Sequence, residues 1–257
     1  MFDTGDSRVE LGLEGSIATI TLARPEKLNA LDLPMIQALE KAAHLIDANS
    51  ALKVAIITGA GARAFCAGGD IAAWSALEAE GFGLQWVRIG HRAFDALTRL
   101  RVPLIAALNG SVMGGGLELA ATADFRIAEE HIIFSLPETG LGIIPGWSGT
   151  QRAVARFGSQ AVRRMALGGE TFSAEEAKQL GLADKVVAKG ESQRAAHVVA
   201  QHLAKRSSFA SAAVKMMINA AEGEDGPRAI EALSGIAVAH SSELKAGIKS
   251  FDAKKKN

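Results

Sequence analysis

Two glutamates, Glu118 and Glu138, lie in apolar stretches where an ionised side chain is costly to bury. Glu118 follows three consecutive glycines in "MGGGLELA" (residues 113–120), and Glu138 lies in "SLPETGLG" (residues 135–142). Two carboxyl groups in one site can accept and donate a proton beside a carbonyl group. Because sequence spacing alone does not bring them together, acid–base chemistry is a hypothesis that the fold must test.

The glycine triplet predicts a second element of the same chemistry. Glycine lets a ligand approach the main chain closely, and free N–H groups at a helix N-terminus favour negative charge. Glu118 lies three residues after Gly115, so both face one side of a helix, and the helix N-terminus is expected to favour the ionised carboxylate. A second glycine-bearing loop, "RAFCAGGDI" (residues 63–71), offers further N–H groups. Two such loops, each donating one N–H, would form an oxyanion hole.

The glycines also have a purely structural interpretation, because they could simply allow a strand and a helix to pack closely. A dinucleotide-binding fingerprint does not fit, since residues 117–120 lack its third glycine, and no P-loop GK[ST] occurs. The stretch "GWSGT" (residues 146–150) resembles a GxSxG nucleophile elbow, but its spacing is wrong. The glycine pattern alone therefore leaves close packing and anion binding both open.

The strands that would position these residues follow from hydrophobic patterning. Residues 9–22 alternate in polarity around Gly15, which predicts a β-hairpin. Residues 54–59 and 102–110 are continuous apolar runs that end in glycine, which is typical of strands buried on both faces. A third run begins at His131. The recurrence of strand, glycine-bearing loop and helix predicts stacked β/α units around one core.

Helix signals lie between and after these strands. Asp32 predicts the start of a helix, Ser173 and Glu176 form a capping-box pattern, and Gly181 is a candidate C-cap. Beyond about residue 190 the pattern is only helical. The fold class is therefore a mixed α/β core over residues 1–190, followed by a helical region over residues 191–257. That second region is short for an independent domain, so it is expected to pack on the core or on another subunit.

Composition excludes several classes of function. The 257 residues include 28 Lys and Arg and 28 Asp and Glu, and a net charge of zero suggests neither nucleic acid nor an anionic membrane as partner. The absence of a signal sequence or an apolar run of membrane-spanning length predicts a cytoplasmic protein. The single cysteine, Cys66, predicts a buried inert thiol and excludes a Cys-rich metal site, so no metal is expected. No Ser/His/Asp constellation can be assigned, which disfavours a protease.

Together the motifs resemble the crotonase (enoyl-CoA hydratase/isomerase) superfamily. The matching stretches keep the order and spacing of that family: "RPEKLNAL", "AFCAGGDI", "NGSVMGGGLELA" with "ADFRIA", "LPETGLGIIPGWSGTQR" and "GLADKVV". The resemblance implies a spiral of ββα units with a helical C-terminal region that builds a homotrimer, often paired into a homohexamer. The ligand would be an acyl-CoA thioester. Coenzyme A would be part of the substrate, and no separate cofactor is expected.

The resemblance also implies roles for single residues. The N–H groups of Gly69 and Gly115 would hold the thioester oxygen. Glu118 would activate water for attack at Cβ, and Glu138 would supply the proton to Cα. Having both glutamates favours hydration of a trans-2-enoyl-CoA. The alternatives are a Δ3,Δ2-enoyl-CoA isomerase, which can work with the Glu138-like residue alone, and a non-catalytic acyl-CoA-binding member of the fold.

Contacts to coenzyme A and the acyl chain are implied for Lys27, Leu28, Ala67, Asp70, Ile71, Trp74, Phe251 and Lys254. Phe251 and Lys254 match a C-terminal pattern that reaches a neighbouring subunit's coenzyme A, although Ala253 replaces the family's acidic residue. A solvated tail is the alternative for Lys254. Asp70 is expected to brace the "AGGDI" turn rather than perform chemistry.

Two tryptophans depart from the family pattern or affect the pocket. Trp147 stands where small residues are common, and Trp74 lies where the wall of the acyl pocket is expected. Each could fill core space, or line the pocket and shorten it. His91 and His131 lie outside the matched motifs, and no role is assigned to them.

Overall fold

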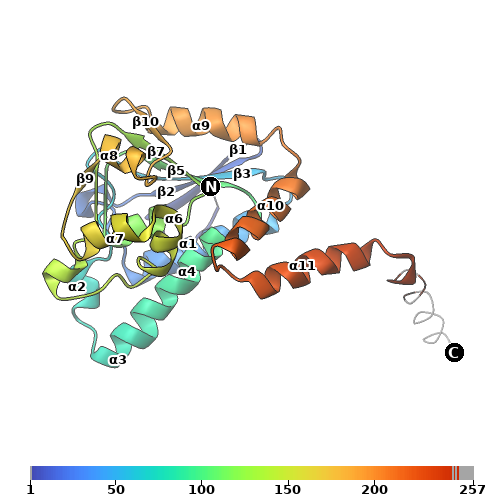
Figure 1. Cartoon of the computed structure of the whole chain (residues 1–257), viewed down its shortest axis with the longest axis horizontal. Coiled ribbons are helices and arrows are strands. Elements are labelled where there is room, and N and C mark those ends of the chain that lie inside the picture. The colour runs from blue at the N-terminus through green and yellow to red at the C-terminus, as the bar shows by residue number, and fades with distance from the viewer. Residues whose placement is uncertain (1, 245, 247, 249–257) are drawn as a thin grey trace. The chain divides into compact units, whose positions relative to one another are not determined.

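The computed structural model describes residues 2–244, 246 and 248 (Figure 1). The chain divides into two compact units, residues 1–212 and residues 213–257. This division falls later than the boundary expected near residue 190, because helix α9 (Ser192–Leu203) packs against strands of the first unit. Phe251 and Lys254 lie outside the described residues.

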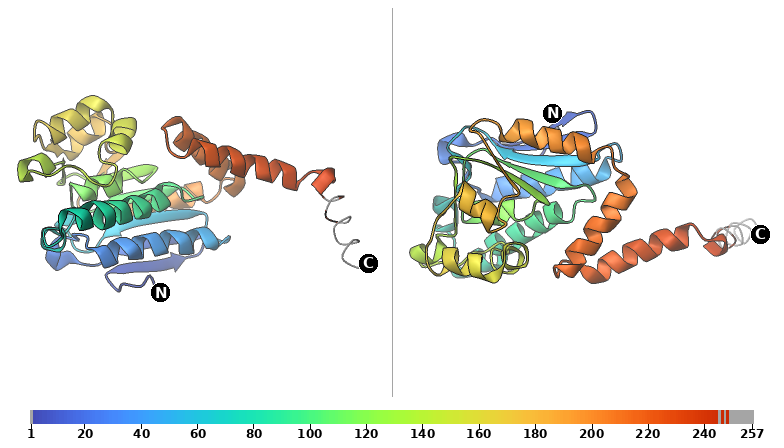
Figure 2. Two further views of the ribbon diagram at one scale, coloured as in Figure 1. Left: turned by 90° about the horizontal axis from the view of Figure 1, so that it is seen from below. Right: turned by 45° about the horizontal axis from the view of Figure 1, so that its top comes forward.

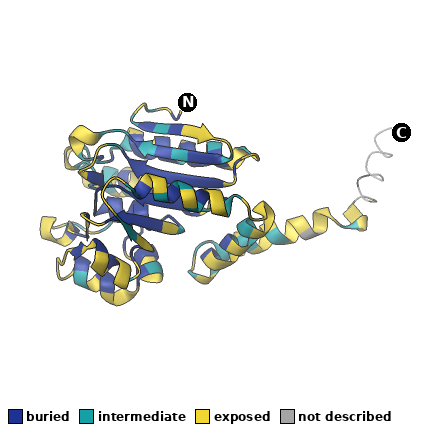
Figure 3. Ribbon diagram, turned by 90° about the horizontal axis from the view of Figure 1, so that it is seen from above, coloured by how far each residue is buried: buried dark blue, intermediate teal, exposed yellow. Residues whose placement is uncertain are grey.

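The first unit contains a six-stranded sheet in the order β1-β2-β3-β5-β7-β10 within the described residues. Its strands are β1 (Val9–Glu14), β2 (Ile17–Leu22), β3 (Val54–Gly59), β5 (Leu104–Leu108), β7 (Phe125–Glu129) and β10 (Lys185–Val187). β1 and β2 pair antiparallel, which confirms the predicted hairpin, and the other neighbouring pairs are parallel. Figure 3 shows how deeply the strands of this sheet are buried.

Helices cover both faces of this sheet, which explains its continuous apolar strands. Ala55 and Ile57 of β3 belong to the core cluster that includes helices α1 (Leu33–Ala48) and α4 (Arg88–Thr98). Val54 and Ile56 point the other way and pack with α9, so successive residues of β3 serve opposite layers. Figure 2 shows α1 and α4 side by side, as their contacts require.

A smaller sheet carries the loops that form the site. Its strands are β4 (Ala64–Cys66), β6 (Ser111–Met113), β8 (Ile133–Ser135) and β9 (Phe172–Ser173), in the order β4-β6-β8-β9. β4, β6 and β8 run parallel, so their C-terminal ends lie along one edge. Each follows a longer strand of the large sheet, namely β3, β5 or β7. This recurrence confirms the repeated units that the sequence predicts.

The remaining helices of the described residues lie either near the site or elsewhere along the chain. Those near the site are α2 (Ile71–Trp74), α3 (Ala79–Gly81), the π-helix η2 (Phe82–Val87), α5 (Gly115–Ala120) and the 3₁₀-helix η3 (Glu138–Leu141). The others are η1 (Pro25–Lys27), α6 (Gln151–Phe157), α7 (Ser159–Ala166), α8 (Ala174–Gln179), α10 (Ser208–Ala221) and α11 (Gly226–Ala239).

The second unit exposes many apolar side chains within this chain. They are Val214, Met217, Ile218, Ile230, Ile236, Val238, Leu244 and Ile248. No helix among the described residues is both long and apolar enough to cross a membrane.

Both predicted helix caps are confirmed. The Asp32 side chain accepts a hydrogen bond from Met35 N at 3.1 Å at the start of α1. Ser173 Oγ accepts from Glu176 N at 3.3 Å, and Ser173 N donates to Glu176 Oε2 at 2.8 Å. Gly181 follows the C-cap of α8 by one residue and has a φ of +79°, which favours glycine there.

The Ser173→Ala variant is expected to lower the free energy of unfolding by about 1 kcal/mol, because one N–H of α8 loses its acceptor. In a chain of this size the melting temperature would fall by about 2–4 °C. Thermal unfolding followed by circular dichroism measures the change, with Ser50→Ala in an exposed turn as the control. Equal melting temperatures for the two variants would contradict the expectation.

Candidate active site

Three loops bring the predicted site residues to one cavity. Gly69 follows β4, Gly115 begins α5 after β6, and Glu138 begins η3 after β8. All three line a cavity of about 50 Å³, and Glu118 lies in its wall. The parallel β4, β6 and β8 end at one sheet edge, so residues distant in sequence meet there.

The loops that carry Gly69 and Gly115 touch each other. A Cβ atom on Gly68 would lie 3.0 Å from Gly115 N, and one on Gly115 would lie 3.4 Å from Gly68 Cα. The N–H groups of Gly69 and Gly115 donate to no other residue in the described part of the chain. Two free N–H donors at one cavity are suited to holding a developing oxyanion.

Hydrogen bonds fix the Gly69 loop from the opposite side. Leu31 N donates to Gly68 O at 2.8 Å, and Asp70 N donates to Leu31 O at 2.7 Å. The Asp70 side chain accepts from Ala72 N at 3.1 Å and pairs with Arg24 at 2.8 Å. Asp70 therefore braces the turn, as the sequence predicts.

The buried thiol of Cys66 also belongs to this loop. Gly68 N donates to Cys66 Sγ at 3.4 Å, and the side chain is fully buried as predicted. Burial raises the pKa of the Cys66 thiol to about 12. The group is therefore protonated at neutral pH and chemically inert in the folded protein.

Glu118 is buried, and two backbone donors hold it. Its Oε1 atom accepts hydrogen bonds from Trp147 N and Gly149 N, each at 2.6 Å. Burial raises the pKa of Glu118 to about 7, these N–H groups oppose the rise, and the negative charge of Glu138 adds to it. The expectation that the helix N-terminus favours the ionised carboxylate is wrong in net effect. α5 is only six residues long, and the loss of solvent outweighs its contribution.

Glu138 differs from Glu118 because one carboxyl oxygen is left without a partner. Its Oε2 atom is buried and has no hydrogen-bond partner among the described residues. Burial also raises the pKa of Glu138. A Cβ on Gly114, which has a φ of +52°, would lie 2.7 Å from Glu138 Oε1, so a side chain at position 114 would displace the carboxyl group from its present position. A buried, unpartnered carboxyl oxygen is available to a ligand.

Four aromatic side chains complete the cavity, and they are called the aromatic wall: Trp74, Phe82, Trp86 and Trp147. The Trp86 and Trp147 rings lie 5.1 Å apart, and Trp147 Nε1 donates to Trp86 O at 3.2 Å. Trp147 is 2% exposed and also lines the cavity. Trp74 is half-buried at the same cavity.

A family model described as enoyl-CoA hydratase/isomerase matches residues 12–257. The chain belongs to the enoyl-CoA hydratase/isomerase family. It is 39% identical over 215 residues to the putative enoyl-CoA hydratase/isomerase YngF of Bacillus subtilis, which covers 84% of this chain and 82% of that relative. It is 35% identical over 216 residues to a short-chain-enoyl-CoA hydratase of Clostridium acetobutylicum, covering 83% and 81% of the two chains.

Solved structures of the family confirm the crotonase fold predicted from the sequence. The structure of an enoyl-CoA hydratase from Bacillus anthracis matches with a TM-score of 0.82 and 30% identity. The match covers 96% of this chain and 97% of that one. Membership of the enoyl-CoA hydratase/isomerase family makes the protein an enzyme.

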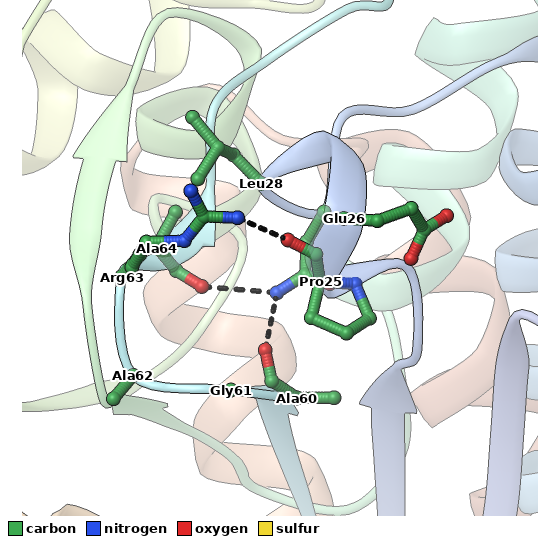
Figure 4. A pocket seen from close by; sticks show the side chains of 9 residues that line it. Pro25, Glu26, Leu28, Ala60, Gly61, Ala62, Arg63 and Ala64 are labelled. Carbon is green, nitrogen blue, oxygen red and sulfur yellow. Dashed lines mark hydrogen bonds between the residues drawn. The ribbon is translucent and has the colours of Figure 1, made fainter.

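Some residues expected at the substrate lie apart from this cavity. Leu28 lines a second pocket of about 200 Å³ between η1 and the β3–β4 turn (Figure 4). There, Arg63 donates to Pro25 O at 3.1 Å. Lys27 and Ile71 are exposed.

Ala67 is the remaining residue for which a substrate contact is predicted, and its backbone links the two pockets. Ala67 N donates to Leu28 O at 3.0 Å, so the loop that carries Gly69 is tied to the rim of the second pocket. Ala67 itself is half-buried.

Sequence reasoning missed two members of the aromatic wall and the support of Glu118. Phe82 and Trp86 are four residues apart in "FGLQW", a spacing that places both on one side of a helix and could have indicated a shared face. Backbone N–H groups hold the Glu118 carboxyl group, and residue type does not indicate which backbone N–H groups will do so. His91 Nδ1 also lies 3.1 Å from Ser148 Oγ, beside this segment, and burial lowers the pKa of His91.

The pKa of Glu118 predicts how stability depends on pH. Below 4.5, the ordinary pKa of glutamate, the carboxyl is protonated in folded and unfolded chains alike. Between 4.5 and about 7 the unfolded chain ionises first, so this group reduces stability progressively as pH rises. Above that range, Glu118→Gln is expected to be about 1–3 kcal/mol more stable than the wild type.

Urea unfolding of both proteins at about pH 5 and about pH 8 measures this difference. The advantage of the variant should be larger at the higher pH. An advantage that shrinks as pH rises would show that the folded protein stabilises the Glu118 carboxylate. Glu130→Gln, at an exposed position, is the control.

Proposed function

We propose that this protein is an enoyl-CoA hydratase, which adds water across the trans-2 double bond of an enoyl-CoA thioester. The observation that carries the proposal is the meeting of two buried carboxyl groups with two free N–H groups at one cavity. This set supplies a base, an acid and an oxyanion hole, all of which the addition of water to a conjugated thioester needs.

The environments of the two carboxyl groups support different roles. Glu118 is held by two N–H donors, which favour a carboxylate, and its pKa of about 7 suits a base at neutral pH. Glu138 has a buried oxygen without a hydrogen-bond partner among the described residues, so that oxygen is free to present a proton to the substrate. We therefore assign Glu118 as the base and Glu138 as the acid.

The reaction then follows from these assignments. The thioester oxygen accepts hydrogen bonds from Gly69 N and Gly115 N. Glu118 takes a proton from water as the water oxygen bonds to Cβ, and the double-bond electrons move to Cα and the thioester oxygen. Glu138 gives its proton to Cα, which completes the hydroxyacyl product. The two carboxyl groups then return to their starting protonation states by exchange with solvent.

The rest of the substrate extends beyond the cavity in this proposal. The nucleotide end of coenzyme A lies near Lys27 and Leu28, beside the second pocket. Phe251 and Lys254 reach coenzyme A from a neighbouring subunit. The exposed apolar side chains of the second unit support association into a homotrimer or homohexamer. Coenzyme A enters as part of the substrate, and the steps above use no separate cofactor.

The decisive experiment follows the loss of ultraviolet absorbance of crotonyl-CoA and identifies the product by chromatography. Formation of 3-hydroxybutyryl-CoA by the wild-type protein supports the proposal. A folded protein that binds crotonyl-CoA without consuming it would refute hydration of this substrate. Calorimetric titration with crotonyl-CoA distinguishes absence of binding from absence of chemistry.

Double-bond isomerisation is a second candidate, because the buried, unpartnered oxygen of Glu138 could move a proton between Cα and Cγ without help from Glu118. The Glu118→Gln variant separates the two reactions. If hydration needs both carboxyl groups, the variant loses hydration of crotonyl-CoA but keeps isomerisation of a 3-enoyl-CoA. Equal loss of both activities would show that Glu118 serves more than the activation of water.

A further inference from the structure

The cavity at the two glutamates is smaller than two other pockets in the described part of the chain. It holds about 50 Å³, whereas the pocket at Leu28 holds about 200 Å³ and one beside Asn109 and Gln193 about 270 Å³. One water needs roughly 10–15 Å³ by this kind of measure, so the cavity has room for only a few non-hydrogen atoms. An acyl chain held there must therefore be short or find an exit.

The aromatic wall stands directly behind the two oxyanion-hole glycines. A Cβ on Gly69 would lie 2.7 Å from Trp86 Cζ2 and 3.3 Å from Trp147 Cη2. A Cβ on Gly115 would lie 2.6 Å from Trp147 Cζ3. The Trp147 ring thus touches the backbone of both glycines. A chain whose carbonyl oxygen is held by these residues meets the Trp147 ring at once on that side.

The Trp147 ring is also fixed in place. A Cβ on Gly90 would lie 2.0 Å from Trp147 Nε1, so the indole occupies the space that a side chain on α4 would need. Phe94 packs edge-on against it at 5.2 Å, and Trp147 Nε1 donates to Trp86 O. Trp86 is 4% exposed and Phe94 is fully buried. The indole therefore packs directly against the backbone of α4 at Gly90.

Other lining residues of the cavity are more exposed. Trp74 and Phe82 meet edge-on with ring centroids 5.9 Å apart, and Trp74 is only half-buried. Ile144, which also lines the cavity, is 72% exposed, so the cavity is open to solvent beside Ile144. Trp147 is 2% exposed and closes the cavity where it meets Gly115.

We propose that Trp147, which packs against Trp86 and against the backbone at Gly90, closes the acyl pocket and restricts the enzyme to short acyl groups. The restriction rests on the proposed function, because it takes the cavity as the site of the acyl chain. The four-carbon crotonyl group is short enough to end before the indole when its carbonyl oxygen is held by Gly69 N and Gly115 N. Chains that extend several carbons further collide with the Trp147 ring.

The test compares kcat/KM for crotonyl-CoA, trans-2-hexenoyl-CoA and trans-2-decenoyl-CoA in the wild type and Trp147→Leu. A misfit of one methylene group typically costs about 10-fold or more, so the wild type should prefer crotonyl-CoA over decenoyl-CoA by at least about 100-fold. Trp147→Leu should reduce that preference by at least about 10-fold. A wild type that uses both substrates equally, or a variant with the same preference as the wild type, would overturn the proposal.

Further variants keep the test informative. Trp147→Phe keeps a ring in the core, so it can replace Trp147→Leu in the test if that variant fails to fold. It should shift the substrate preference in the same direction. Phe209→Leu, at an exposed aromatic residue outside the cavity lining, is the control, and its preference should stay within about threefold of the wild type. A shift in a Trp74→Leu variant without one in the Trp147 variants would place the limit at Trp74 and refute the proposal.

Binding separates this proposal from the proposed reaction. Calorimetric titration with butyryl-CoA and decanoyl-CoA measures the size limit without any turnover. Tighter binding of butyryl-CoA, reversed or abolished in the Trp147 variants, would support the size limit even in a protein that does not hydrate crotonyl-CoA. Equal binding of both thioesters to the wild type would refute the limit even if hydration is observed.

Discussion

Replacing Glu138 by glutamine is expected to lower kcat/KM for hydration of crotonyl-CoA by about 10²–10⁴-fold, the usual contribution of a positioned acid or base. Glutamine keeps the shape of the side chain but has no proton to give to Cα. Glu138 Oε2 is the unpartnered buried oxygen at the cavity, so no neighbouring group replaces it within the described residues. Steady-state kinetics on crotonyl-CoA measures the loss.

The same substitution at Glu130 is the control, because that side chain is exposed and distant from the cavity lining. Both variants should unfold at temperatures close to that of the wild type or above it. Glu138→Gln should also lose isomerisation of a 3-enoyl-CoA, since both reactions exchange a proton at Cα. A variant that keeps a tenth or more of the wild-type hydration rate would remove Glu138 from the role of acid.

Replacing Gly116 by alanine is expected to cost more than about 3 kcal/mol of folding free energy and to abolish activity. A Cβ at this position would lie 2.0 Å from the carbonyl oxygen of Cys66 and 2.8 Å from its carbonyl carbon. Both are backbone atoms, so no side-chain rotation relieves the clash. The β4 loop and α5 must separate, which moves Gly69 and Gly115 apart.

Urea unfolding and crotonyl-CoA kinetics together test this expectation. Gly12→Ala is the control, because a Cβ there has no neighbour within 4 Å. If Gly116→Ala folds, its kcat/KM for crotonyl-CoA should fall by more than the fraction of unfolded protein explains. The reason is that the oxyanion hole depends on the contact between the two loops. A Gly116→Ala protein with wild-type stability and activity would show that the loops can separate freely.

The sequence predicts most of the elements because their signals are local. Asp32 caps α1, and residues 54–59 form β3, since a cap or a buried strand depends on neighbouring residues. The boundary near residue 190 is different. The apolar positions of α9 predict a helix, but Ala196 and Ala200 pack on the large sheet, which no local pattern reveals.

For the candidate site too, the sequence predicts what depends on local signals but not what depends on packing between distant segments. Residue type and glycine context point to Glu118, Glu138 and the two glycine-bearing loops, and the family resemblance singles out Gly69 and Gly115 within those loops. The fold brings all four residues to one cavity. The net rise in the pKa of Glu118 was missed, because burial is set by surrounding segments rather than by its own helix. The aromatic wall was found only in part for the same reason, since its members come from separate segments of the chain.

Cys66 gives this protein a built-in reporter of local opening. The chain has one thiol, which is buried beside the Gly69 loop. An alkylating reagent can reach it only when β4 and α5 come apart, so the labelling rate measures the free energy of that opening. A bound acyl thioester that bridges Gly69 and Gly115 should slow the labelling in proportion to its occupancy. Ligand binding at the oxyanion hole could thus be followed in an inactive variant, without any dye or turnover.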